Sequence, residues 1–175
     1  MEYIHKQEYE LSAIREYTEL MVYSAVCFFV PFVMGHPQWF VGIAVNTALV
    51  LGALNIKGYK ILPIILLPSI AVLSRGLIFG ALTPTLVYLI PFIWISNTII
   101  VLSIKYFRLN VKISRKLSLL LASGLKAGFL TLATLALFGF GIISAALILP
   151  MSILQFGTAL AGGAVAFGVQ KITHS

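Results

Sequence analysis

Apolar residues dominate six stretches of the chain, and short polar or basic segments separate them. The stretches cover residues 20–35, 38–55, 61–80, 85–106, 117–138 and 143–169. A helix needs about 20 mainly apolar residues to cross about 30 Å of hydrocarbon, so each stretch predicts one membrane-spanning helix. The first stretch is short, and we expect it to gain length from residues before Leu20. The strand-length alternation typical of a membrane barrel is absent from the sequence. The pattern therefore predicts an all-α membrane protein, a bundle of six transmembrane helices.

Residues 1–19 are polar and contain all five acidic residues of the chain. They lack the basic segment followed by an apolar core that marks a cleavable signal peptide. We interpret them as a cytoplasmic lead-in, helical and continuous with the first span, and residues 20–175 as a single membrane domain. Composition agrees, because 10% of the residues are charged, against about 25% in soluble globular domains.

Basic residues predict the orientation, because loops rich in Lys and Arg stay in the cytoplasm. They gather in the lead-in, in the loops after the second and fourth spans, and at the C-terminal end: Lys6, Arg15, Lys57, Lys60, Lys105, Arg108, Lys112, Arg115, Lys116 and Lys171. Both termini are therefore expected in the cytoplasm, with the protein in the cell membrane. The net charge of +7 reflects this topology and suits anionic lipid head groups. It is no indication of nucleic-acid binding.

Two basic residues do not follow that rule, Arg75 near the end of the third span and Lys126 in the middle of the fifth. A charge at such depth costs about 2.5–3.5 kcal/mol and usually faces a bundle interior or a watery cavity. Lys126 could bind a ligand in a cavity, or it could be a structural residue that snorkels or donates to neighbouring carbonyls. Its face of the helix includes Ser123, and the pair Gly124 and Gly128 on the other side could seat a neighbouring helix. Arg75 is better explained as an interfacial arginine.

Several kinds of chemistry are missing. The chain has no Asp, and no Glu after Glu19, so no intramembrane carboxylate is available to couple transport to protons or sodium. The single cysteine, Cys27, excludes an internal disulfide, and the histidines are too scattered for a metal or haem site. Catalytic and nucleotide-binding motifs are absent. We expect no enzyme activity, cofactor or metal.

Polar side chains inside the spans form a sparse set, with Asn46 in the second, Asn97 in the fourth and Gln155 in the sixth. Buried amides need partners. They could be struts between helices, or they could converge with Lys126 on a bound molecule. Both interpretations stay open at this level.

The order of GHPQWFVGIAVNTALVLGAL, IPFIWISNTIIVL, LKAGFL and LPMSILQFGTALAGGAVA resembles the substrate-binding S component of energy-coupling factor (ECF) transporters, over residues 34–172. The resemblance implies a prokaryotic protein of the cell membrane that captures a vitamin-like or other small polar or anionic micronutrient from outside. It also implies two partners, a transmembrane T component and a pair of ABC ATPases. His36, Gln38 and Trp39 would belong to a loop that covers the pocket. Asn97, Lys126, Gln155 and Thr158 would line it.

One feature departs from that family. Many S components have two alanines four residues apart on the first helix, where the T component docks, but here Ser24 and Ala25 are followed by Phe28 and Phe29. A smooth stripe on the second helix, Ala44, Ala48 and Gly52, offers another surface. Two other classes remain open, a structural or accessory subunit of a larger membrane complex and a stand-alone channel. Polar lining for a channel is thin.

Overall fold

A computed structural model describes residues 2–34, 36–76 and 83–173. The described part is helical and contains no β-strand. Six helical segments within it are long and apolar enough to cross a membrane: Ala13–Val33, Gln38–Asn55, Gly58–Arg75, Val87–Asn110, Arg115–Gly139 and Ala145–Thr173. The prediction of six helical spans is confirmed.

Three of these segments are single helices, α1 (Ala13–Val33), α2 (Gln38–Asn55) and α6 (Arg115–Gly139). The third span joins η2 (Gly58–Ile61) to α3 (Leu62–Arg75), and the fourth joins η4 (Val87–Leu89), α5 (Ile90–Ile104) and the π-helical η5 (Lys105–Asn110). The last span joins η6 (Ala145–Leu147), α7 (Ile148–Met151) and α8 (Ile153–Thr173). Short pieces η1 (Glu2–His5) and α4 (Thr83–Leu86) complete the described chain.

The first span gains length before Leu20, as expected, and the third ends earlier than its apolar stretch. Helix α1 begins at Ala13, where Ser12 caps it by accepting a hydrogen bond from the Arg15 amide at 3.4 Å. Residues 13–19 of the lead-in are therefore part of α1, whereas residues 6–12 separate it from η1. Helix α3 ends at Arg75 because Gly76 adopts a left-handed backbone, φ 64°, which stops a helix. The expected continuation over residues 77–80 lies outside the described residues.

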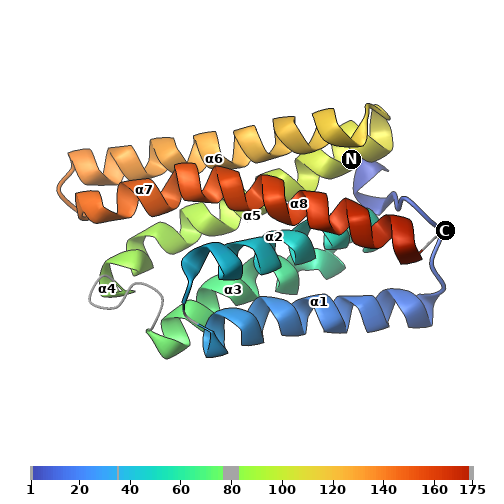
Figure 1. The fold of residues 1–175 in the computed structure, drawn as a ribbon, viewed down its shortest axis with the longest axis horizontal. Helices are drawn as coiled ribbons and strands as arrows, with labels where there is room; N and C mark the ends of the chain where they lie inside the picture. The colour runs from blue at the N-terminus through green and yellow to red at the C-terminus, as the bar shows by residue number, and fades with distance from the viewer. Residues whose placement is uncertain (1, 35, 77–82, 174–175) are drawn as a thin grey trace.

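Helix α2 lies at the centre of the bundle and contacts α1, α3, α5 and α8, with α1 and α6 at opposite edges (Figure 1). Glycines allow the closest approaches. A Cβ on Gly162 of α8 would lie 2.7 Å from the Ile43 carbonyl oxygen of α2. Gly162 and Gly163 of the last span are therefore packed closely, whereas a Cβ on Gly168 would meet nothing within 4 Å. Ala48 and Gly52 are buried, and Gly52 faces Ile61 and Ile64. Two of the three residues of the stripe on α2 are therefore inside the molecule and Ala44 is partly buried, so the stripe does not form a continuous surface for a partner.

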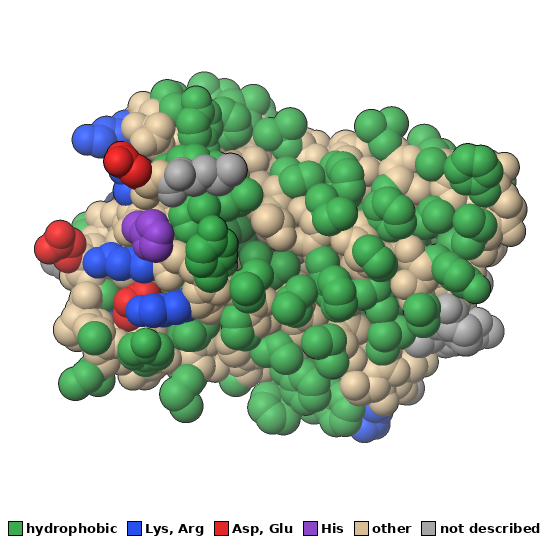
Figure 2. All heavy atoms as spheres, turned by 180° about the vertical axis from the view of Figure 1, so that it is seen from behind, with side chains coloured by type: hydrophobic (Ala, Val, Ile, Leu, Met, Phe, Trp, Pro, Cys, Tyr) green, Lys and Arg blue, Asp and Glu red, His purple; other side chains and the backbone are tan. Residues whose placement is uncertain are grey.

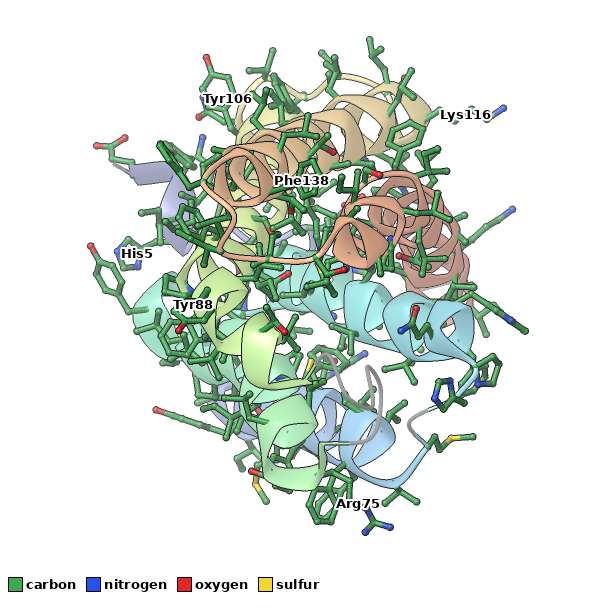
Figure 3. The ribbon with its side chains drawn as sticks, turned by 90° about the vertical axis from the view of Figure 1, so that its left-hand side faces the viewer. His5, Arg75, Tyr88, Tyr106, Lys116 and Phe138 are labelled. Carbon is green, nitrogen blue, oxygen red and sulfur yellow. The ribbon has the colours of Figure 1, made fainter. Side chains whose placement is uncertain are left out.

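On the face shown in Figure 2, charged side chains gather at one end of the bundle, apart from one basic side chain at the opposite end, and Figure 1 shows that both chain termini lie at the charged end. We call it the terminal end, and the opposite one the far end. Between the two ends the visible face is largely apolar (Figure 2), as expected for helices surrounded by lipid. Arg75 lies at the far end, where its side chain points away from the bundle (Figure 3). Its guanidinium carbon is 5.4 Å from the centre of the Phe32 ring.

The N-terminal segment, residues 2–12, crosses the terminal end and is held by both backbone and side-chain contacts. The Glu8 amide donates to the Leu54 carbonyl at 2.8 Å. Its carboxylate accepts from Arg108 at 2.7 Å and from Arg115 at 2.8 Å. Beneath it, the Nζ of Lys105 donates to the Lys6 carbonyl at 2.9 Å. The segment therefore ties α2, η5 and α6 together.

Replacing Glu8 by Gln is expected to lower stability by about 1 kcal/mol at neutral pH, because two partly exposed arginine contacts are lost. Burial alone raises the pKa of Glu8, but the hydrogen bonds and charges of Arg108 and Arg115 outweigh it and hold the pKa below the ordinary value of a glutamate. A carboxylate with a lowered folded pKa stabilises the fold above its unfolded pKa, and this contribution disappears as the pH falls through the folded value. Thermal unfolding of detergent-solubilised protein from pH 7 to pH 3 measures the effect.

The control variant is Glu10→Gln, which removes an exposed carboxylate from the same segment. The difference in unfolding temperature between wild type and Glu8→Gln should shrink in acid, whereas Glu10→Gln should match wild type throughout. A Glu8→Gln deficit that persists undiminished at pH 3 contradicts the ion-pair explanation.

Candidate ligand cavity

A cavity of about 100 Å³ lies between the helices in the half of the bundle nearer the far end. Residues of all eight α-helices of the described chain, α1 to α8, line it. The polar lining residues are Gln38, Asn46, Ser69, Asn97, Lys126, Gln155 and Thr158. The volume holds several water molecules but is below the roughly 300–1,000 Å³ of pockets for drug-sized ligands. In this conformation the cavity fits only a compact chemical group.

Lys126 reaches the cavity from the middle of α6 and is 2% exposed. Its Nζ donates to the Asn46 Oδ1 at 2.5 Å and to the Asn97 Oδ1 at 3.0 Å. Lysine is thus turned inward, and it joins α2, α5 and α6. An ammonium group has three donors, so these two bonds leave one for a bound molecule.

Both asparagines are held so that their oxygens face the lysine. The Asn46 Nδ2 donates to the Gly42 carbonyl at 2.9 Å and to the Thr158 hydroxyl at 3.3 Å. The Asn97 Nδ2 donates to the Ile65 carbonyl of α3 at 3.1 Å. Because each amide nitrogen already has an acceptor, rotation of either amide would lose hydrogen bonds. The site is preorganised to present two acceptors and one amine.

No carboxylate lines the cavity. All acidic residues of the chain fall within residues 2–19, and those described with ion pairs, Glu8, Glu16 and Glu19, bind cations of the terminal end. A charged Lys126 therefore has amide acceptors but no counter-ion from this chain. A buried cation without a counter-ion favours the binding of an anion.

The structure brings five of the seven predicted site residues to the cavity and leaves two outside it. Lys126, Asn97, Gln155, Thr158 and Gln38 line it.

His36 is exposed and lines no described hollow, and Trp39, 54% exposed, lies on a neighbouring groove instead. Residues 38–40 form the first turn of α2 rather than a covering loop. Gly35 lies outside the described residues.

The surroundings of Lys126 on α6 correct one expectation, that Gly124 and Gly128 seat a neighbouring helix. Lys126 makes no hydrogen bond to Ser123, whose hydroxyl is buried without a partner in the described chain. Gly124 and Gly128 do not seat a helix, since a Cβ on either would meet nothing within 4 Å among the described residues. The inward face carries Lys126 and the opposite face is open.

Sequence reasoning missed Ser69, on α3, which lines the cavity and is 3% exposed. Its hydroxyl has no hydrogen-bond partner in the described structure. A serine in the apolar run LPIILLPSIAVL carries little signal by itself. A buried hydroxyl without a partner at a cavity wall is a further donor or acceptor for a ligand.

Comparison with known proteins gives no relative: no family model, curated protein or solved structure matches the chain. The class that the fold defines is a multi-pass membrane protein with six candidate transmembrane helices. Any narrower assignment depends on the cavity and its chemistry.

Proposed function

We propose that this protein is the substrate-binding S component of an ECF-type uptake transporter and captures a small polar or anionic micronutrient in the cavity. One observation carries the proposal: the amine of Lys126 lines a cavity near the far end and has no carboxylate partner there. With both termini in the prokaryotic cytoplasm, that cavity belongs to the outer half of the membrane. An anion from outside would provide the missing counter-ion.

The proposal also fits what the chain lacks. The sequence has no nucleotide-binding motif, so energy for release would come from a T component and a pair of ABC ATPases. No intramembrane carboxylate is present to couple transport to an ion gradient. The protein would therefore bind and present its ligand, and the partner proteins would drive the reorientation that releases it.

Mass spectrometry of small molecules that copurify with the protein tests this function. Wild type is expected to carry one anionic or strongly polar compound near stoichiometry, and Lys126→Met is expected to lose at least nine-tenths of it. Lys116→Met is the matched control, because Lys116 lies on the same helix and is exposed. It should retain the compound.

A second candidate is an accessory subunit of a larger membrane complex, with no ligand of its own. It is favoured by the two amide acceptors that Lys126 already has on α2 and α5, which is the geometry of a strut between helices. That function predicts an empty wild-type protein that copurifies with foreign subunits. It also predicts that Lys126→Met lowers the unfolding temperature without any loss of a bound compound.

A further inference from the structure

A second hollow adjoins the cavity, on the outer side of α2 and α8. It is a groove of about 480 Å³ whose lining is mainly apolar, with Ile43, Leu149, Ile153 and Leu154 among the lining residues. Gly157 also lines it, and a Cβ there would meet nothing within 4 Å. The groove is therefore open where α8 begins.

The cavity and the groove share four lining residues, Gln38, Pro150, Leu154 and Thr158. Helices α2 and α8 touch at one level of this wall, where a Cβ on Gly42 would lie 2.8 Å from Thr158 Cγ2. Gln38 lies one helical turn nearer the far end than Gly42. Gln38, Pro150 and Leu154 line both hollows beside that contact.

The two hollows differ in chemistry. The cavity provides the Lys126 amine, the amide oxygens of Asn46 and Asn97 and the unpartnered hydroxyl of Ser69. Its volume admits only a compact group. The groove is more than four times larger and has a mainly apolar lining.

The charge of the cavity lining limits which chemical group of a ligand can bind there. Among the described residues that line the cavity, Lys126 is the one basic residue, and none is acidic. A single negative charge neutralises it, whereas a dianion leaves a buried excess and a cation is repelled.

We propose that the ligand is an amphipathic monocarboxylate, with its carboxylate at Lys126 in the cavity and an apolar chain that passes between α2 and α8 into the groove. This inference rests on the proposed function of the cavity and adds the groove as a second subsite. Gln38 and Leu154 shift to admit the chain. Trp39, which lines the groove, packs against its end.

Quenching of tryptophan fluorescence detects directly whether the apolar chain of the ligand lies in the groove. In a Trp94→Phe background Trp39 is the remaining tryptophan of two, and bound 8-bromooctanoate is expected to quench it. The protein is held in lipid nanodiscs. Competition by butyrate, octanoate and octanamide then gives their relative affinities. Octanoate should compete at least tenfold better than butyrate, because a fully buried methylene contributes up to about fourfold. Octanamide, which has the chain without the charge, should compete at least tenfold worse than octanoate.

Gly157→Leu fills the groove and leaves the cavity unchanged. Gly157→Leu should reduce the affinity for octanoate to the level of the affinity for butyrate. The affinity for butyrate should not change. The matched control is Gly128→Leu, the same substitution at an open glycine on α6 that lines neither hollow. It should change neither affinity. Lys126→Met should abolish the quenching by 8-bromooctanoate, because the probe is itself a carboxylate.

The outcomes separate the two proposals. Equal competition by butyrate and octanoate, or equal loss of both in Gly157→Leu, overturns the groove subsite and leaves the cavity function standing. Quenching that persists in Lys126→Met means that the groove holds only a bilayer acyl chain, which also overturns the inference. If no carboxylate competes but a compound still copurifies with wild type, the proposal of an amphipathic monocarboxylate is wrong. The proposal that the cavity binds a small molecule then remains valid. If nothing copurifies either, the proposed function itself fails.

Discussion

Gly162→Ala should destabilise the protein by about 3 kcal/mol or more, or prevent recovery of folded protein altogether. The new Cβ would lie 2.7 Å from the Ile43 carbonyl oxygen and 2.8 Å from the Thr47 amide nitrogen. Both are backbone atoms of the central helix, so relief requires α2 and α8 to move apart. Overpacking in a close-packed interior costs 1–3 kcal/mol and more when backbone must shift. Separation would also stretch the bond of 3.0 Å from the Thr47 hydroxyl to the Gly162 carbonyl.

Gly168→Ala is the control, on the same helix and with nothing within 4 Å of the added Cβ. It should be neutral or stabilising by up to about 1 kcal/mol, since alanine favours helix over glycine. Thermal unfolding midpoints and the monodisperse fraction after gel filtration in detergent measure both variants. If Gly162→Ala unfolds at the same temperature as Gly168→Ala, the close contact between α2 and α8 is not present.

Lys105→Met is expected to release the N-terminal segment and to cost several kcal/mol. Lys105 is completely buried, and its Nζ donates to the carbonyls of Lys6 and Ile56, each at 2.9 Å. Methionine fills a similar volume but donates nothing, so two buried carbonyls lose their partner at about 1–3 kcal/mol each. Both lost hydrogen bonds lie where the N-terminal segment crosses the terminal end of the bundle. Gln7 of the same segment donates to the Asn55 carbonyl.

Hydrogen exchange detects that release. The Glu8 amide, bonded to the Leu54 carbonyl at 2.8 Å, should exchange at least tenfold faster in Lys105→Met than in wild type. Lys112→Met removes an exposed lysine from the neighbouring connection and should leave exchange unchanged. Unchanged protection of Glu8 in Lys105→Met would show that the salt bridges to Arg108 and Arg115 hold the segment by themselves.

The spans were predictable because the bilayer imposes a length and an apolar composition that single sequences display. Lys126 could be singled out for the same reason, since a lone amine at that depth is costly wherever it points. The hydrogen-bond partners of Lys126 were harder to predict from the sequence. Asn46 and Asn97 lie 80 and 29 residues away along the chain, and periodicity on one helix carries no information about which helices are neighbours.

Lys105 is a buried residue whose burial could not be predicted from the sequence. In the sequence it belongs to a basic cluster and reads as a loop charge, yet it is the first residue of a π-helical continuation of α5 and is covered by residues 2–12. Polar segments of this kind carry no apolar pattern from which docking could be predicted. The same holds for Ser69 and for the groove, which arise only when α2, α3 and α8 are assembled.

The lysine junction also has a consequence for biogenesis. Helices α2 and α5 are synthesised before α6. The amides of Asn46 and Asn97 therefore enter the membrane before Lys126, which joins them, has been added to the chain. Thr158, which holds the Asn46 amide nitrogen at 3.3 Å, arrives later still. The polar centre of this bundle can therefore be completed only after the last hairpin has been inserted.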